Sequence, residues 1–252
     1  MRCSDMATSG LRAAIGLGAA FVVFAPALAD DAVVVAAPVF TVGDAWIYER
    51  TQDQGSAGPP RQRVALRVER IDGDAMLVVV ALDGRPPSHD LVGLDWSHRG
   101  AANGQETVTG RPLSFPLSVG QSWTADYTTP LKHGRPGFAR FRTTYKAVGW
   151  TDVATPAGVF RTLEVEARGT IETHLASATP VAPGHHRASP RGGKAPPPPQ
   201  SPSITIQGLE RDAFYYAPKL KAFAKIVEEQ YDAQAVRVSQ DTQVLTAFRT
   251  GP

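Results

Sequence analysis

The sequence predicts a mostly β protein, built on a curved antiparallel sheet that forms a half-barrel, a barrel or a sandwich and carries a disordered Pro-rich insertion. Two observations predict this fold class. Short segments in which apolar and polar residues alternate recur along the chain, and turns rich in Gly, Pro and Asp separate them. No segment shows an unambiguous long helical pattern. Together these features predict roughly nine or ten strands.

The beginning of the chain has the features of an export signal. Arg2 and Arg12 supply positive charge, and the apolar run Ala13–Phe24 is followed by Ala27-Leu28-Ala29, a small-x-small cleavage pattern. The apolar run is shorter than the roughly 20 residues that a membrane-spanning helix needs. We therefore expect a signal peptide at residues 1–29 and no transmembrane anchor after its cleavage.

Cleavage near Ala29-Asp30 leaves residues 30–252 as a single β domain. It also removes Cys3, the only cysteine of the chain, so no disulfide is expected. An exported protein without disulfides favours a periplasmic or secreted bacterial protein. Met1 and Met6 both precede the apolar run, and either start gives the same expectation. The net charge of +2 is too small to attract nucleic acid, so no such partner is expected.

The clearest strand signal is a hairpin over Tyr145–Gly169. Its turn is Thr155-Pro156-Ala157-Gly158, in which proline and glycine occupy favourable turn positions. Leu163, Val165 and Ala167 alternate with charged residues. This alternation predicts a strand with one face toward a core and the other toward water.

The segment Leu220–Tyr231 fits two structures. Its apolar residues match the spacing of an amphipathic helix, but its apolar stretch, Phe223–Val227, is short and the flanking segments are all β-like. We favour a strand.

A second open point is the pattern V-G-x-x-W, which occurs at Val42–Trp46 and again at Val119–Trp123. It indicates either two related halves or a chance recurrence.

Residues 178–202 differ in composition from the rest of the chain. They hold many prolines, several basic side chains and no acid, so they cannot bury enough apolar surface to fold, and we expect a disordered basic loop. The loop is a possible contact for anionic envelope polymers. His185-His186 within it lacks the further ligands that a metal site needs, so no metal is expected.

No catalytic or cofactor motif is present in the sequence. The three residue types of a catalytic triad occur together at Ser88-His89-Asp90, but a triad is assembled from positions that are distant in the chain. We therefore expect no cofactor and no enzymatic activity.

The aromatic residues are the remaining candidates for a binding site. Curved sheets can enclose ligands, and aromatic side chains either line such cavities or fill the core of a β domain. The candidates for an apolar ligand cavity are Trp46, Trp96, Trp123, Tyr145, Trp150, Tyr215 and Tyr216.

Four short motifs carry a resemblance to known proteins: V-G-D-x-W at Val42–Trp46, its repeat at Leu117–Trp123, T-P-A-G-x-F at Thr155–Phe160 and Tyr-x-A-P at Tyr215–Pro218. With them the chain resembles a broad group of uncharacterised exported bacterial all-β proteins, a domain of unknown function. The resemblance implies a curved antiparallel sheet similar to the half-barrels of lipoprotein carriers. It implies no activity and no site residues, and the Pro-rich insertion is not part of the group's pattern.

Three functions follow as hypotheses. The first is a non-enzymatic protein that binds a lipid or another apolar or amphipathic envelope ligand in the concave face of its sheet. The second is a protein-interaction or envelope-assembly factor that contacts another envelope protein through a sheet edge or the Pro-rich loop. The third is an enzyme of unknown type, which requires a cleft where titratable groups of shifted pKa converge.

Overall fold

The computed structural model describes residues 33–54, 60–102, 105–131, 137–175 and 204–250. Within these ranges the chain forms twelve strands of one antiparallel sheet, which confirms the predicted mostly β fold class. The strands are β1 (Ala45–Asp53), β2 (Arg61–Asp72), β3 (Ala75–Leu82), β4 (Ser88–Gly93), β5 (His98–Ala102), β6 (Gln105–Thr109), β7 (Ser122–Pro130), β8 (Gly137–Thr155), β9 (Gly158–Leu175), β10 (Ile204–Ala217), β11 (Ala222–Asp232) and β12 (Arg237–Arg249).

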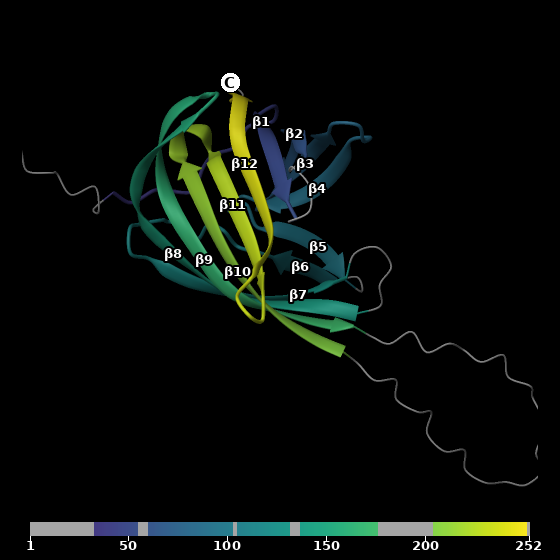
Figure 1. Ribbon diagram of the computed structural model, residues 1–252. Coiled ribbons are helices and arrows are strands. Elements are labelled where there is room, and N and C mark those ends of the chain that lie inside the picture. Colours follow the sequence, from purple (N-terminus) through teal and green to yellow (C-terminus); the bar gives the residue numbers. More distant parts are fainter. Residues whose placement is uncertain (1–32, 55–59, 103–104, 132–136, 176–203, 251–252) are drawn as a thin grey trace, which may run out of the picture.

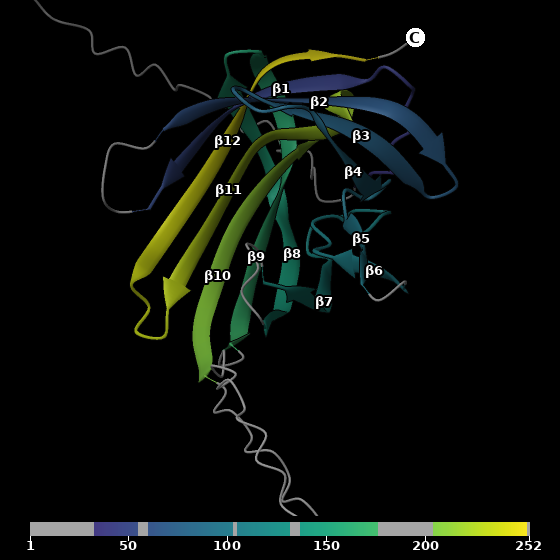
Figure 2. The same ribbon diagram turned by 90° about the vertical axis from the view of Figure 1, so that its right-hand side faces the viewer.

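The sheet curls into a nearly closed barrel (Figures 1 and 2). In the described part of the chain, strands that are consecutive in sequence pair with each other, except β6 and β7. The first strand, β1, pairs with the last, β12. Among the described residues no pairing joins β6 to β7, so these two strands are the free edges. The barrel is thus closed where the chain begins and ends, and open in the middle of the sequence.

The described residues form twelve strands, more than the nine or ten that the sequence predicted. The polar segment after Ser97 forms β5 and β6, which pair with each other over five positions. β4 ends at Gly93, and Trp96 in the turn after it adopts a positive φ of 60°. Short polar strands at a sheet edge carry little apolar periodicity, which explains why the alternation pattern did not reveal them.

The two copies of the V-G-x-x-W motif lie at the starts of β1 and β7, the first strands of the two sets β1–β6 and β7–β12. In both copies the glycine has a positive φ, 97° at Gly43 and 85° at Gly120, and lies two residues before the start of β1 or β7. Gly43 N–H donates to the Val68 carbonyl at 2.9 Å, and Gly120 N–H donates to the Ala147 carbonyl at 2.8 Å. In each half this bond joins the turn to the second strand.

The residue after each of these glycines has the same role. The Asp44 carboxylate accepts the N–H of Thr41 at 2.9 Å, and the Gln121 side-chain oxygen accepts the N–H of Ser118 at 3.0 Å. Both side chains therefore close a turn three residues back. The shared geometry favours two related halves over a chance recurrence of three letters.

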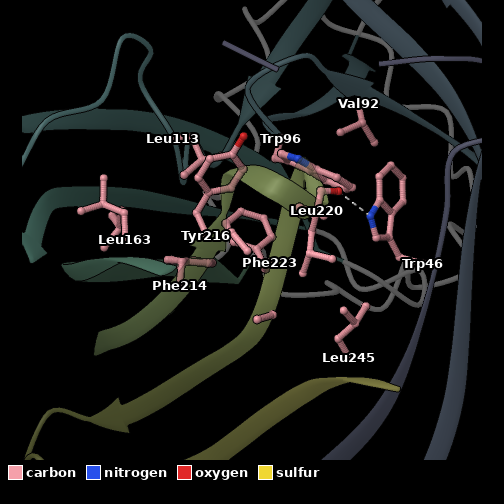
Figure 3. Close-up of a cluster of buried hydrophobic side chains, with 14 of the residues drawn as sticks. Trp46, Val92, Trp96, Leu113, Leu163, Phe214, Tyr216, Leu220, Phe223 and Leu245 are labelled. Atoms are coloured by element: carbon pink, nitrogen blue, oxygen red, sulfur yellow. Dashed lines mark hydrogen bonds between the residues drawn. The ribbon is translucent and has the colours of Figure 1, made fainter. Parts of the chain in front are cut away.

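The core lies at one end of the barrel and is rich in aromatic side chains (Figure 3). Trp46, Trp96 and Phe223 contact one another there, with ring centroids of Trp46 and Trp96 5.2 Å apart. The indole of Trp46 donates to the Leu220 carbonyl at 2.9 Å, and the indole of Trp96 donates to the Lys221 carbonyl at 2.9 Å. The core therefore satisfies the polar groups of the chain where it turns into β11.

The ambiguous segment after Pro218 is a strand. A 3-10 turn spans Pro218–Leu220, Lys221 adopts a left-handed φ of 58°, and β11 then runs from Ala222 to Asp232. The strand pairs with β10 on one side and β12 on the other, and this pairing overrides the helical spacing of its apolar residues.

The predicted hairpin over Tyr145–Gly169 is confirmed. β8 and β9 pair along their whole length, from Gly137 opposite Leu175 to Thr155 opposite Gly158. Leu163, Val165 and Ala167 are buried. The expected signal peptide at 1–29 and the Pro-rich loop at 178–202 lie outside the described residues. Within the described ranges, no helix has the length and hydropathy needed to cross a membrane.

Candidate functional site: the interior of the barrel

A cavity of about 1360 Å³ lies on the inner face of the sheet. Nine strands contribute to its lining, and both free edges are among them, through Thr109 on β6 and Tyr127 and Thr129 on β7. The unpaired edges therefore border the cavity. Its volume exceeds the 300–1,000 Å³ or so that is typical of pockets for small ligands.

The register of the strands places one continuous row of side chains across the inner face. Successive members are paired neighbours on adjacent strands, from β7 through β12 to β1. The row is Trp123, Tyr145, Ala167, Asp212, Glu228, Asp241 and Gln52. Its centre is three consecutive carboxylates, one on each of three adjacent strands.

This arrangement of charge is unfavourable by itself. Side chains directly opposite on antiparallel strands have Cβ atoms about 5 Å apart, and like charges in such pairs destabilise a sheet. Two carboxylates about 6 Å apart repel each other by roughly 1 to 3 kcal/mol, depending on the local dielectric. Protonation or a bound cation relieves this repulsion.

Asp241 is the one carboxylate of the row with a strong counterion. Its Oδ2 atom accepts hydrogen bonds from both the Nε (2.7 Å) and an Nη of Arg50, and from the side-chain amide of Gln52 at 3.0 Å. Its other oxygen, Oδ1, is buried and has no hydrogen-bond partner. Arg50 therefore satisfies only half of this carboxylate.

Among the described residues, neither Asp212 nor Glu228 forms an ion pair, and the charge of Arg50 only partly offsets the raised pKa of Glu228. Asp212 accepts one hydrogen bond, from the backbone N–H of Glu229 at 3.2 Å, and burial together with the charges of Glu228 and Glu210 raises its pKa to about 8. Glu228 is accessible to solvent from the side of the cavity. Protein atoms of the concave wall lie around the rest of its side chain. This burial and the charge of Asp241 raise the pKa of Glu228 to about 7.

A fourth carboxylate, Glu210, lies on β10 two residues before Asp212, on the side away from the core. It is 8 % exposed, and it accepts a hydrogen bond from the hydroxyl of Thr143. Burial raises its pKa, and the hydrogen bond from Thr143 partly offsets this. Gly169 lies between the two side chains, and a Cβ atom there would come within 2.6 Å of the Glu210 carboxylate. A glycine is therefore required where these side chains meet.

An aromatic wall adjoins the carboxylates. Tyr127 and Phe141 stack on each other with ring centroids 4.9 Å apart, and both line the cavity with Tyr145. Burial raises the pKa of Tyr145 to about 12. Further apolar lining comes from Leu131 and Phe214. The cavity therefore offers both apolar contact area and a patch of negative charge.

Acidic groups dominate the charge of the lining. Six carboxylates face two guanidinium groups, which gives a net charge of −4 when every carboxylate is ionised. The acids are Asp53, Asp90, Glu210, Asp212, Glu228 and Asp241, and the bases are Arg50 and Arg99. In the part of the chain that the structure describes, no three His, Cys, Asp or Glu side chains are grouped so that they could hold a metal ion.

Of the seven aromatic candidates, only Tyr145 is among the residues that line the cavity. Trp46, Trp96 and Tyr216 are buried in the core, with exposed fractions of 0 %, 7 % and 1 %. Trp46 and Trp96 are held there by the hydrogen bonds of their indoles.

The other three candidates lie at the periphery. Trp123 stacks on Tyr145 with centroids 5.6 Å apart and donates its indole N–H to the Arg111 carbonyl at 2.8 Å. Trp150 packs partly buried against the core, and Arg161 lies 5.9 Å from its ring centroid. Tyr215 alternates with the inward-facing Phe214 and has Lys225 5.8 Å from its ring.

The four carboxylates were not among the residues that the sequence singled out. One signal could have found them: acids occur in phase with the core-facing residues. Glu210 and Asp212 continue the alternation of Phe214 and Tyr216 on β10, and Asp241 continues that of Leu245 on β12. An acid on the buried side of a strand marks a polar interior.

Three solved structures resemble this fold. A proposed lipoprotein from Parabacteroides distasonis has a TM-score of 0.47 at 12 % identity, covering 85 % of this chain and 99 % of its own. A proposed exported protein with a YmcC-like fold from Bacteroides fragilis has a TM-score of 0.39 at 14 % identity, covering 86 % and 100 %. The hypothetical lipoprotein YmcC from Escherichia coli has a TM-score of 0.34 at 12 % identity, covering 83 % and 85 %.

No family model matches the sequence, and no curated protein matches it significantly.

Proposed function

We propose that this protein is an exported, non-enzymatic binding protein that holds an amphipathic envelope ligand inside its barrel. The observation that supports this most is the cavity of about 1360 Å³, bordered by two unpaired strand edges. A core that only had to be stable would be packed to near-crystalline density. A large lined cavity is the usual site of a small ligand in a β-barrel.

Two features of the lining favour an amphipathic ligand over a purely apolar one. Tyr127, Phe141 and Leu131 offer apolar area on one side of the cavity, and the carboxylates of β10, β11 and β12 offer charge on the other. A wholly apolar ligand would cover these carboxylates without satisfying them, which is costly. A ligand with a polar group and a chain satisfies both parts.

The experiment is native mass spectrometry of the full-length protein, expressed in an exporting bacterium and purified without detergent. We expect an added mass of lipid size that is lost on denaturation. Thr129→Trp places a large side chain at the cavity lining on β7 and should reduce the loaded fraction at least fivefold. Thr128→Trp is the matched control, because the adjacent residue is exposed and outside the lining.

A protein that carries no added mass, and that also takes up no dodecyl maltoside when incubated with it, would refute the proposal. Equal loading of the two Trp variants would refute the cavity as the place of binding.

An enzyme is the second candidate, and one observation favours it. Asp212 and Glu228 are adjacent carboxylates of raised pKa in a cavity, an arrangement that general acid–base catalysis uses. Chromatography with mass detection of the ligand after release separates the two functions. A binding protein returns its ligand unchanged, whereas an enzyme converts it and loses this conversion in Asp212→Asn.

A further inference from the structure

The proposed function leaves the chemical class of the ligand open, and the charge of the cavity narrows it. Asp212 and Glu228 are directly opposite each other, Asp241 is directly opposite Glu228, and Arg50 forms its ion pair with Asp241. A ligand with an anionic headgroup would add to this negative charge. A neutral headgroup would leave it unchanged.

We propose that the barrel selects an amphiphile with a cationic amine or quaternary ammonium headgroup, which lies against Asp212 and Glu228 while its apolar chain lies along Tyr127 and Phe141. This inference rests on the proposed function, since it concerns the same cavity.

Three observations support a cationic headgroup. The lining has six carboxylates and two guanidinium groups. Among the described residues, the side chains of Asp212 and Glu228 make no ion pair, and Asp241 Oδ1 accepts no hydrogen bond. The described carboxylates are spread along a row and are not grouped as metal ligands, so a bare metal ion is a poor occupant.

The apolar part of the ligand has a separate place. Tyr127 and Phe141 stack on β7 and β8 and face the cavity, with Leu131 at the end of β7. β9 separates this wall from the carboxylates of β10 and presents only Ala167 in the row between Tyr145 and Asp212. The small side chain leaves the charged and apolar parts accessible to one molecule.

Binding of a cation should depend on pH in a defined direction. A cationic headgroup binds the ionised carboxylates, so its affinity rises with pH until Asp212 and Glu228 are both ionised. Burial and mutual repulsion keep both carboxylates partly protonated near pH 7. The groups that face them are Glu210 on the same strand, Tyr127 on β7, Tyr145 on β8, Asp241 on β12, Arg50 and Gln52 on β1, and the uncharged Ala167 on β9.

Three probes with the same twelve-carbon chain test the headgroup. Dodecyltrimethylammonium, dodecyl maltoside and dodecanoate are titrated into the full-length protein by calorimetry, below their critical micelle concentrations, at pH 8.5. We expect the cation to bind at least tenfold more tightly than the maltoside, and dodecanoate to bind most weakly. Equal or tighter binding of the maltoside or of dodecanoate would overturn the inference.

The double variant Asp212→Asn/Glu228→Gln tests which groups are responsible. It should reduce the preference for the cation over the maltoside to threefold or less. Asp72→Asn/Asp83→Asn removes the same two charges from exposed turns and should keep the preference. Retention of the full preference in the cavity variant would contradict the assignment, and Asp212→Asn alone provides the same comparison if the double variant does not fold.

The pH arm uses the quaternary ammonium probe, because its charge is the same at pH 6 and pH 8.5. Its affinity should be at least threefold higher at pH 8.5 in the wild type and independent of pH in the cavity variant. The failures are distinguishable. The proposed function stands and this inference falls if the maltoside binds as tightly as the cation and Thr129→Trp blocks its binding. If none of the three probes binds, both fall.

Discussion

Asp212 on β10 lies directly opposite Glu228 on β11, and both carboxylates line the interior of the barrel. Such a pair weakens a folded protein when both members are ionised. Burial raises the pKa of Asp212 to about 8 and that of Glu228 to about 7, so both titrate in the range where the protein is expected to work. The charge on this wall of the cavity therefore changes with pH near neutrality.

The first prediction concerns stability against pH. Because the folded-state pKa of Asp212 is raised, the folded protein holds this proton more tightly, and stability falls as pH rises from about 4 toward 8. Asp212→Asn removes the charge and should stabilise the protein. The gain in free energy of unfolding over the wild type should be about 0.5–1 kcal/mol larger at pH 8.5 than at pH 5. Urea denaturation at the two pH values measures this.

Asp83→Asn, in an exposed turn, is the control for that experiment and should show no comparable pH-dependent difference. A stabilisation by Asp212→Asn that is the same at both pH values would show that the charge of Asp212 is not the cause.

The second prediction concerns Arg50. Arg50→Gln leaves the Asp241 carboxylate without its counterion and should destabilise the fold by about 1–3 kcal/mol, since both side chains are largely shielded from solvent. Adding Asp241→Asn should restore most of the loss. Arg61→Gln breaks an exposed ion pair with Glu49 and should change stability by less than about 0.5 kcal/mol. Chemical denaturation of the wild type and the three variants gives the comparison, and an equal loss in Arg50→Gln and Arg61→Gln would contradict it.

The third prediction concerns the close approach at Gly169. A Cβ atom there would lie 2.7 Å from the Arg142 carbonyl oxygen and 2.9 Å from the Thr143 hydroxyl. Gly169→Ala should therefore lower stability by about 1–3 kcal/mol. Gly149→Ala is the control on β8, where a Cβ atom meets nothing within 4 Å. We expect this control to be neutral or slightly stabilising in thermal unfolding. A neutral Gly169→Ala would show that β8 and β9 are less tightly packed than described.

The fourth prediction separates two tryptophans by their indole nitrogens. Trp46 donates to the Leu220 carbonyl, whereas the Trp150 indole N–H is buried without a partner. Trp46→Phe leaves a buried carbonyl unsatisfied and should cost about 1–3 kcal/mol. Trp150→Phe removes an unsatisfied donor and should be close to neutral. Equal losses in urea denaturation would contradict these assignments.

The sequence predicted the parts of the fold that depend on local patterns. The hairpin over Tyr145–Gly169 was predictable because alternation and turn residues lie within one continuous segment. The strand after Lys221 was predictable from its short apolar stretch and its β surroundings. The recurring pattern V-G-x-x-W also predicted two similar local structures, and the turns at Gly43 and Gly120 make matching hydrogen bonds.

The candidate site was not predictable in the same way. The row of carboxylates joins Asp212, Glu228 and Asp241, and their adjacency depends on the register of three strands. The aromatic residues were the natural candidates from the sequence, and the structure places Trp46 and Trp96 in the core, where their indoles donate to the carbonyls of the turn at Leu220 and Lys221. Whether an inward-facing residue meets the packed core or the cavity depends on how the whole sheet curls into the barrel.

The most direct test of the central claim is to find where a bound amphiphile lies. A dodecyl amphiphile with a quaternary ammonium headgroup and a photoreactive diazirine in its chain is bound to the full-length protein, irradiated and mapped by peptide mass spectrometry. The account predicts adducts on cavity-lining residues such as Tyr127, Phe141 and Leu131, which unlabelled dodecyltrimethylammonium prevents. Adducts confined to exposed apolar residues such as Val39 and Val159 would contradict it.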